Sequence, residues 1–263
     1  MKFIYFASDF HLGIPDRFSS LVREKKLIRW LDMVKEDAEA IYLLGDLFDF
    51  WFEYKTVVPK GYTRLFSKLA EITEKGIPVH FFRGNHDLWA FNYLNDESGV
   101  IIHDNILEVE LKGTKFFLAH GDGLGPGDLG YKFLKKIFRS KFNQYLFRWL
   151  HPDLGTKMGL YFSRGSRISN MIKEDRNENY TLAEKEILLV FSRKMAAEKP
   201  EIGYFVFGHR HVPTHLKITE NASCIILGDW VKHFSYGRFD GERFEIKYFD
   251  EPTSTLETKT LLD

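Results

Sequence analysis

The sequence is poor in several features that define whole classes of protein. It contains one cysteine, Cys224, so no intramolecular disulfide can form and a reducing cytosol is the expected setting. No stretch approaches the ~18 consecutive apolar residues of a membrane span. The apolar run of residues 3–7 is too short for the core of a signal peptide. These absences favour a protein that is made and folded in the cytoplasm.

Net charge is also absent, because 37 Lys and Arg balance 37 Asp and Glu. A neutral chain lacks the general electrostatic attraction on which dedicated nucleic-acid binders depend, so no nucleic-acid partner is expected. Linkers rich in Gly, Ser or Pro and low-complexity tracts are missing as well. We therefore predict a single α/β domain over residues 1–263, interrupted by one long insertion.

What the sequence does contain is one kind of turn, repeated five times. A short apolar run ends directly in metal-ligand residue types, as Asp-x-His, Gly-Asp-x-x-Asp, Gly-Asn-His-Asp, His-Gly-Asp and Gly-His-x-His in chain order. Because parallel strands present their carboxyl ends at one edge of a sheet, we expect these turns to form one site. The candidate metal ligands are Asp9, His11, Asp46, Asn85, His120, His209 and His211.

Seven nitrogen and oxygen donors are too many for one ion. They suit two divalent cations roughly 3.5–4 Å apart that share a bridging carboxylate, which is the arrangement used for in-line displacement at phosphorus. Mn²⁺ is the expected metal, with Fe, Zn²⁺ and Mg²⁺ as alternatives. The donor set therefore predicts a dimetal phosphohydrolase.

The segments between the turns predict the fold. Apolar periodicity indicates a helix over residues 19–37, capped by one of the two serines at its start, and a second helix over residues 60–76. The alternation of strands with helices predicts parallel pairing. Alternating residues around turns at 112–113 and 240–241 predict two antiparallel hairpins. The predicted architecture is a four-layer α-β-β-α sandwich of two mixed sheets.

Residues 128–175 form the predicted insertion. This segment carries ten Lys and Arg against four Asp and Glu, a net charge of +6, and it is dense in Phe, Tyr, Trp and Leu. Such a composition favours amphipathic helices that form a lid over the metal cleft, lie peripherally on the cytoplasmic face of the inner membrane, or line a groove for acyl chains. The alternative is an ordinary solvated helix face.

The ordered set of turns from Asp9 to His211 resembles the calcineurin-like metallophosphoesterase superfamily. The resemblance implies that Asp46 bridges two ions. One ion would be bound by Asp9, His11, Asp46 and His211, and the other by Asp46, Asn85, His120 and His209. It also implies catalytic roles for His86 and Asp49: the His86 imidazole, hydrogen-bonded by Asp49, would stabilise the phosphoryl group or protonate the leaving oxygen.

Within that superfamily, residues 45–51, 97–99, 120–122 and 227–230 resemble the UDP-2,3-diacylglucosamine hydrolases of lipid A biosynthesis, as does the helical insertion. That family uses a metal-bound hydroxide to cleave a nucleotide-linked acylated sugar to UMP and 2,3-diacylglucosamine 1-phosphate. The resemblance implies substrate contacts from Asn85, His86, Asp122, Ser166, Asn170, Lys173 and His209. The chain departs from the family's pattern at His86, where the family typically has arginine, and at Asp49, where it typically has glutamate.

Two alternatives remain open at this stage. The chain is a phosphodiesterase or phosphatase for another substrate, such as a nucleotide, a nucleic acid or a phosphoprotein, or it is a non-catalytic scaffold of the same fold. The salt dependence of binding separates a nuclease from a lipid enzyme. Metal content separates an enzyme from a scaffold.

Overall fold

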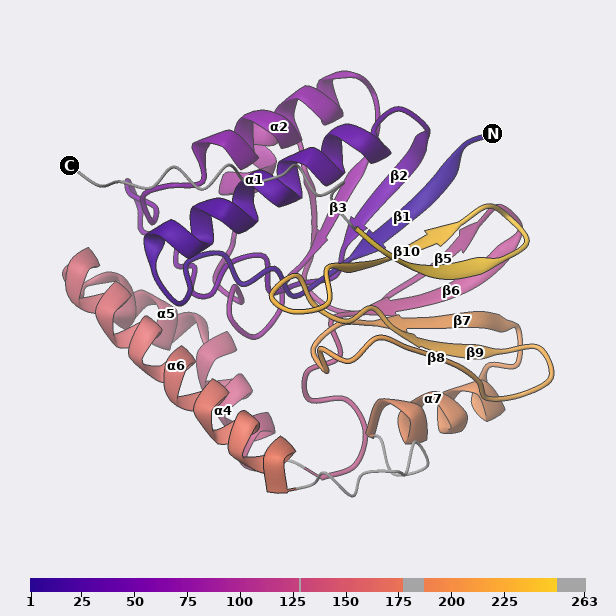
Figure 1. The fold of residues 1–263 in the computed structure, drawn as a ribbon. Helices are drawn as coiled ribbons and strands as arrows, with labels where there is room; N and C mark the ends of the chain where they lie inside the picture. Colours follow the sequence, from indigo (N-terminus) through magenta and orange to yellow (C-terminus); the bar gives the residue numbers. More distant parts are fainter. Residues whose placement is uncertain (128, 177–186, 250–263) are drawn as a thin grey trace, which may run out of the picture.

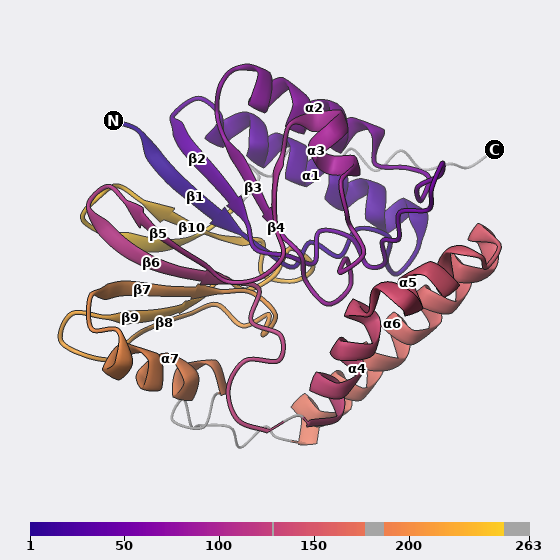
Figure 2. The same ribbon diagram turned by 180° about the vertical axis from the view of Figure 1, so that it is seen from behind.

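A computed structural model describes residues 1–127, 129–176 and 187–249, except for the side chains of residues 164 and 166–176. Two β-sheets face each other at the centre, and helices cover their outer faces (Figure 1). The order of layers is therefore helix, sheet, sheet, helix, which confirms the predicted sandwich. The view from behind shows the same layers (Figure 2).

The first sheet contains the parallel strands that the alternating pattern predicts. Its order is β11-β10-β1-β2-β3-β4, with β1 to β4 parallel and β10 antiparallel to β1. The predicted hairpin at residues 240–241 is formed by β10 and β11. The strands are β1 (Phe3–Ala7), β2 (Ala38–Leu43), β3 (Val79–Phe82), β4 (Ile101–His103), β10 (Ser235–Phe239) and β11 (Phe244–Tyr248).

The second sheet has the order β5-β6-β7-β9-β8. The hairpin predicted at residues 112–113 joins β5 to β6, and β6, β7 and β9 run parallel. The strands are β5 (Leu107–Leu111), β6 (Thr114–Ala119), β7 (Ile202–Phe207), β8 (Thr214–Lys217) and β9 (Ser223–Ile226). As a result, each strand that precedes a predicted donor turn belongs to a parallel pair.

Aromatic side chains fill the space between the two sheets. Phe6 of β1 and Phe116 of β6 come from opposite sheets, and their stacked rings lie 5.8 Å apart. Both side chains are completely buried. Rigid rings in this position fix the spacing of the sheets, and with it the positions of the turns at the strand ends.

Helices α1 (Arg17–Val34), α2 (Thr63–Glu74) and α3 (Tyr93–Ser98) accompany the first sheet. The cap of α1 differs from the expectation. Asp16 caps the helix, because its carboxylate accepts a hydrogen bond from the Ser19 amide at 2.9 Å. The expected serine cap is wrong because the helix begins two residues earlier, where an ionised acceptor is available.

The remaining helices are α4 (Leu129–Arg139), α5 (Lys141–Arg148), α6 (Pro152–Arg176) and α7 (Ile187–Glu198). Figures 1 and 2 show α7 against the second sheet, whereas α4, α5 and α6 lie together and away from both sheets. In the described part of the chain, no helix combines the length and the apolar character needed to cross a membrane.

Replacing Phe116 with Ala should lower the free energy of unfolding by about 3–5 kcal/mol, because it removes a ring that packs between the sheets. Urea unfolding measures the change. Phe18, which is 78% exposed on α1, provides the matched control. Phe18→Ala should change the free energy by less than about 0.5 kcal/mol. Similar effects from both variants would contradict this account of the core.

Candidate dinuclear metal centre

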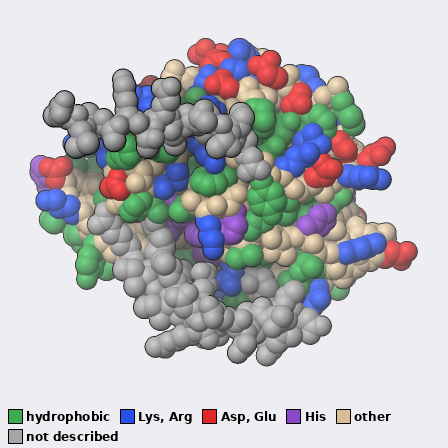
Figure 3. All heavy atoms as spheres, in the orientation of Figure 1, with side chains coloured by type: hydrophobic (Ala, Val, Ile, Leu, Met, Phe, Trp, Pro, Cys, Tyr) green, Lys and Arg blue, Asp and Glu red, His purple; other side chains and the backbone are tan. Residues whose placement is uncertain are grey.

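The structure brings all seven predicted donors together at the strand ends. Asp9, His11 and His211 form one group, and Asp46, His120 and His209 form another; within each group the ligand atoms lie within 4.8 Å of one another. Asn85 joins the second group, since its Oδ1 lies 3.2 Å from His120 Nε2. Histidine side chains are visible near the middle of the face shown in Figure 3.

Backbone strain is concentrated at these donors. Five of the seven have a positive φ between 44° and 67°, a region that non-glycine residues rarely adopt. Each such residue costs on the order of 1 kcal/mol or more, so the surrounding structure must hold it in place. The strained donors are Asp9, His11, Asp46, His209 and His211. Such strained positions are typical of functional sites.

The turns after β2 and β3 are locked together by Asp87 and Gly84. The buried Asp87 carboxylate accepts hydrogen bonds from the amides of Gly84 and Leu47, each at 2.7 Å. Any Cβ at position 84 would overlap Asp46 Oδ1, so only glycine fits there. Sequence reasoning assigned no role to Asp87, although it follows directly after the candidate residues Asn85 and His86.

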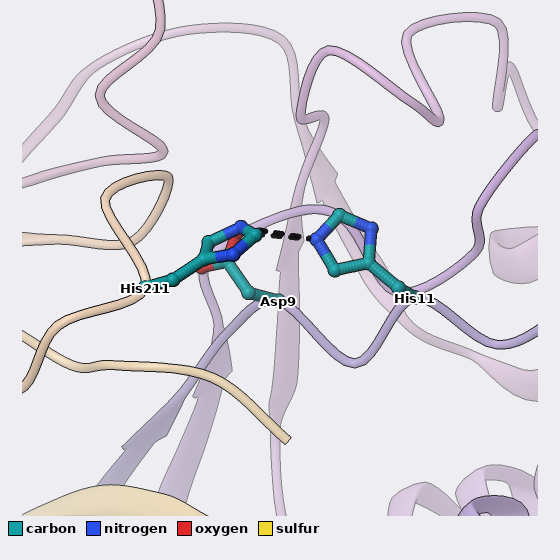
Figure 4. A group of neighbouring side chains, drawn as sticks. All are labelled: Asp9, His11 and His211. Carbon is teal, nitrogen blue, oxygen red and sulfur yellow. Dashed lines mark hydrogen bonds and ion pairs between the residues drawn. The ribbon is translucent and has the colours of Figure 1, made fainter. Parts of the chain in front are cut away.

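The first donor group presents facing nitrogen atoms (Figure 4). His11 Nε2 lies 3.2 Å from His211 Nε2, and the same His211 atom lies 3.2 Å from Asp9 Oδ1. The buried Asp9 Oδ1 has no hydrogen-bond donor among the described residues. A cation between these atoms would satisfy all of them at once.

The second group shows the same convergence more clearly. His120 Nδ1 donates to the carbonyl oxygen of Leu44 at 2.7 Å, which leaves Nε2 as an acceptor in the neutral ring. That atom faces Asp46 Oδ2 at 3.3 Å and Asn85 Oδ1 at 3.2 Å. In the neutral ring that ligates a metal, these three atoms are all acceptors and cannot hydrogen-bond to one another. The residues therefore fit a divalent metal ion.

The electrostatics of the site favour cations. Burial lowers the pKa values of His11 and His209 to about 4, so both rings are neutral and able to ligate a metal at neutral pH. Burial opposes the charge of Asp9, but His211 and His11 outweigh it and lower the pKa of Asp9 well below its usual range. Burial also opposes the charge of His120, yet Asp46 raises the pKa of this ring to about 10. The carboxylates thus create a strongly negative potential.

His86 lies beside the donors and is hydrogen-bonded to Asp49. His86 Nδ1 donates to the main-chain oxygen of Asp49 at 2.9 Å, whereas the nearer carboxylate oxygen is 3.7 Å away. That carboxylate also lies 3.8 Å from His11 Nδ1. The expected hydrogen bond between His86 and Asp49 is therefore present, and it uses the main-chain oxygen of Asp49.

The expected substrate contacts fall into two sets. The Asp122 carboxylate is buried and already engaged by α4, with Tyr131 Oη at 2.6 Å and Lys135 Nζ at 2.5 Å. It links the turn after β6 to α4. The side chains of Ser166, Asn170 and Lys173 lie outside the described residues.

Asp229 is a residue at the site that sequence reasoning did not assign. Its carboxylate accepts from the amides of Lys232 and His233 at 2.8 and 2.9 Å, and Oδ2 lies 3.9 Å from His211 Nδ1. Asp229 therefore favours the tautomer in which His211 presents Nε2 to Asp9. The apolar strand followed by Gly-Asp at 228–229 is the signal that identifies such a residue.

Comparison with known proteins agrees with this geometry. The calcineurin-like phosphoesterase family model matches residues 4–213, and the chain belongs to this family. It is similar to a UDP-2,3-diacylglucosamine hydrolase of Porphyromonas gingivalis, with 35% identity over 94% of this chain and 98% of that protein. Hydrolases of the same name from Vibrio parahaemolyticus and Neisseria meningitidis serogroup B are 27% and 29% identical, each over 92% of this chain and 96% of the relative.

Replacing Asp46 with Ala should abolish metal binding at both positions, because Asp46 lies next to both donor groups. Elemental analysis after Mn²⁺ loading should find two ions per chain in the wild type and fewer than one in the variant. Free Mn²⁺ at about 100 times its Kd should raise the unfolding free energy of the wild type alone, by about 2.7 kcal/mol for each ion bound. Asp153→Ala, in the exposed first turn of α6, is the control. A single ion in the wild type would contradict the dinuclear site.

Proposed function

We propose that this chain hydrolyses the pyrophosphate of UDP-2,3-diacylglucosamine to UMP and 2,3-diacylglucosamine 1-phosphate. The observation that carries the proposal is the proximity of a dinuclear phosphoesterase centre to helices rich in apolar side chains. Similarity to hydrolases of this name extends over almost the whole chain. The chain is a metal-dependent hydrolase, and its substrate is an amphiphile that uses both features.

The metal ligands are part of the proposal. Asp9, His11, Asp46 and His211 would hold one ion, and Asp46, Asn85, His120 and His209 the other, with Mn²⁺ as the proposed metal. When bound, such a pair lowers the pKa of water and withdraws charge from phosphoryl oxygens. The protein contributes rigidity, since the strained turns, Asp87 and Asp229 hold these side chains in position before any ligand arrives.

His86 supplies the proposed proton-transfer group. Its Nδ1 hydrogen is held by the Asp49 carbonyl, so Nε2 faces the centre, 3.9 Å from Asp46 Oδ2. An Nε2 proton in this position can stabilise the phosphoryl oxygens or pass to the leaving lipid phosphate. This role does not need the arginine that the hydrolase family typically has at position 86.

The three helices α4, α5 and α6 supply the proposed lipid-facing surface. They expose large apolar side chains, and exposed basic side chains accompany them. We propose that residues 128–175 are a lid inserted into a single domain, and that this lid attaches the enzyme peripherally to the anionic cytoplasmic face of the inner membrane. The exposed apolar residues include Leu129, Phe133, Phe142, Tyr145, Trp149, Tyr161 and Phe162.

The substrate is tested by comparing UDP-2,3-diacylglucosamine, deacylated UDP-glucosamine and bis(p-nitrophenyl) phosphate with Mn²⁺ in detergent. The acylated nucleotide should be preferred by at least about 100-fold in kcat/KM, because only this compound contacts both the metal centre and the apolar helices. In ¹⁸O-labelled water the label should enter UMP. Equal turnover of all three compounds would leave a phosphoesterase of another specificity.

Membrane attachment is tested by flotation with anionic vesicles. Changing the exposed Lys136, Lys141, Arg148 and Lys157 to Glu should weaken binding at least about 100-fold, since each basic residue near an anionic surface contributes about 1 kcal/mol. The control variant carries the same changes at basic residues exposed elsewhere, namely Arg193, Lys194, Lys217 and Arg243. Equal loss in the two variants would show that the lid is not the attachment surface.

A further inference from the structure

We propose that Ser163 of α6 is a positioning residue for His86, so that the lid completes the active centre in addition to covering it. This inference rests on the proposed role of His86. Ser163 Oγ lies 3.1 Å from His86 Nδ1, and Ser163 is only 8% exposed. Much of the described part of α6 is exposed, including its neighbours Tyr161 and Phe162. The hydroxyl group is therefore directed toward the imidazole.

The direction of the hydrogen bonds follows from the chemistry of the Asp49 carbonyl group, the His86 ring and the Ser163 hydroxyl group. The Asp49 carbonyl oxygen can only accept, and at 2.9 Å from His86 Nδ1 it requires a hydrogen on that nitrogen. Ser163 Oγ at 3.1 Å then accepts a share of the same hydrogen. Two acceptors on one side restrict rotation of the ring. Nε2 is thereby kept facing the metal centre.

The shape of α6 explains how a helix comes so close to the site. Gly155, Gly159 and Ser163 recur every four residues, so they lie on one face of the helix. A Cβ at Gly159 would overlap the Phe50 ring, and a Cβ at Gly155 would overlap Tyr54 Oη. The helix therefore packs directly against the segment that follows Asp49. This packing sets the depth at which Ser163 meets His86.

The segment that follows Asp49 is also hydrogen-bonded to the turn that contains His86, and this turn contacts the helices of the lid. The Trp51 amide donates to the carbonyl oxygen of His86 at 3.2 Å, and Trp89 Nε1 donates to the carbonyl oxygen of Phe138 on α4 at 2.8 Å. Phe147 of α5 packs on the Trp89 ring, with centroids 4.8 Å apart. The turn that carries His86 thus contacts α4 and α5 through the Trp89 side chain. Displacement of α6 would remove one of the two acceptors that orient the imidazole.

A double-mutant cycle tests the proposal in the full-length, Mn²⁺-loaded enzyme. Ser163→Ala should lower kcat about 3- to 10-fold, the usual effect of one hydrogen bond, while KM changes less than about twofold. In a His86→Ala background the same change should have no further effect, because Ser163 acts through the ring. Equal losses in both backgrounds, or no loss in either, would overturn the positioning role.

Two further variants separate positioning from a general effect on the lid. Ser163→Thr keeps the hydroxyl group and should restore most of the lost kcat. Gly159→Ala should lower kcat as Ser163→Ala does, because the added methyl group pushes α6 away from Phe50. Gly165→Ala, where a Cβ meets nothing within 4 Å, should behave as the wild type. Thermal unfolding checks that each variant is folded. If Ser163→Thr does not fold, the double-mutant cycle of Ser163→Ala with His86→Ala decides whether Ser163 positions the ring.

The substrates distinguish this inference from the proposed function. The cycle is measured with UDP-2,3-diacylglucosamine and with bis(p-nitrophenyl) phosphate, which lacks acyl chains. If the wild type hydrolyses only the artificial diester, the substrate proposal fails, and the cycle on the diester still tests Ser163. If the acylated nucleotide is hydrolysed but the cycle shows additive losses, the substrate stands and the positioning role is wrong.

Discussion

The contact between Asp46 and His120 joins the two sheets at the candidate metal centre. Asp46 follows β2 of the first sheet and His120 follows β6 of the second, with 3.3 Å between Oδ2 and Nε2. The His120 ring is also hydrogen-bonded to the carbonyl oxygen of Leu44. Before a metal ion displaces its proton, the His120 ring is drawn to the Asp46 carboxylate, and this attraction is strong in a buried site, where water screens little. The relative position of the sheets and the geometry of the site therefore depend on each other.

This dependence requires a rigid interior. Five donors adopt left-handed backbone conformations, which persist only when the surrounding packing over-determines them. The aromatic layer between the sheets, including Phe6 and Phe116, provides that packing. Amide hydrogen bonds to Asp87 and Asp9 hold the turns locally. Stability held in the core thus compensates for strain at the site.

The three lid helices are connected to the centre by polar contacts, not only by apolar ones. Asp122 belongs to a turn that also supplies a donor, and it binds Lys135 and Tyr131 of α4. Ser163 of α6 in turn contacts His86. Because the same helices expose apolar side chains, a lipid surface that moves them would also move groups at the metal centre. If the proposed membrane attachment holds, this arrangement would couple the membrane-facing helices to the metal centre.

The sequence alone was sufficient to predict the architecture and the residues that the structure groups at the strand ends. Apolar runs that end in metal-ligand residue types indicate the ends of strands, and parallel strands bring such ends together at one edge of a sheet. The two sheets and the proximity of Asp9 to His211 could therefore be predicted from this pattern. Contacts within one turn, such as the cap of α1, were less certain, because Asp16 and Ser19 are both competent acceptors and only the start of the helix selects between them.

Contacts between distant segments were decided by the tertiary structure. The sequence places Asp49 near His86 but cannot tell its carboxylate from its carbonyl oxygen, since that choice depends on how the segment after β2 pairs with the turn after β3. Ser163 carries no signal of its own, because a serine in a helix is ordinary. It reaches the imidazole only because Gly155 and Gly159 let α6 approach Tyr54 and Phe50. Local pattern determined which residues are candidate metal ligands, because ligand types directly follow apolar strands, and close packing between segments far apart in the chain decided which residues hold them in place.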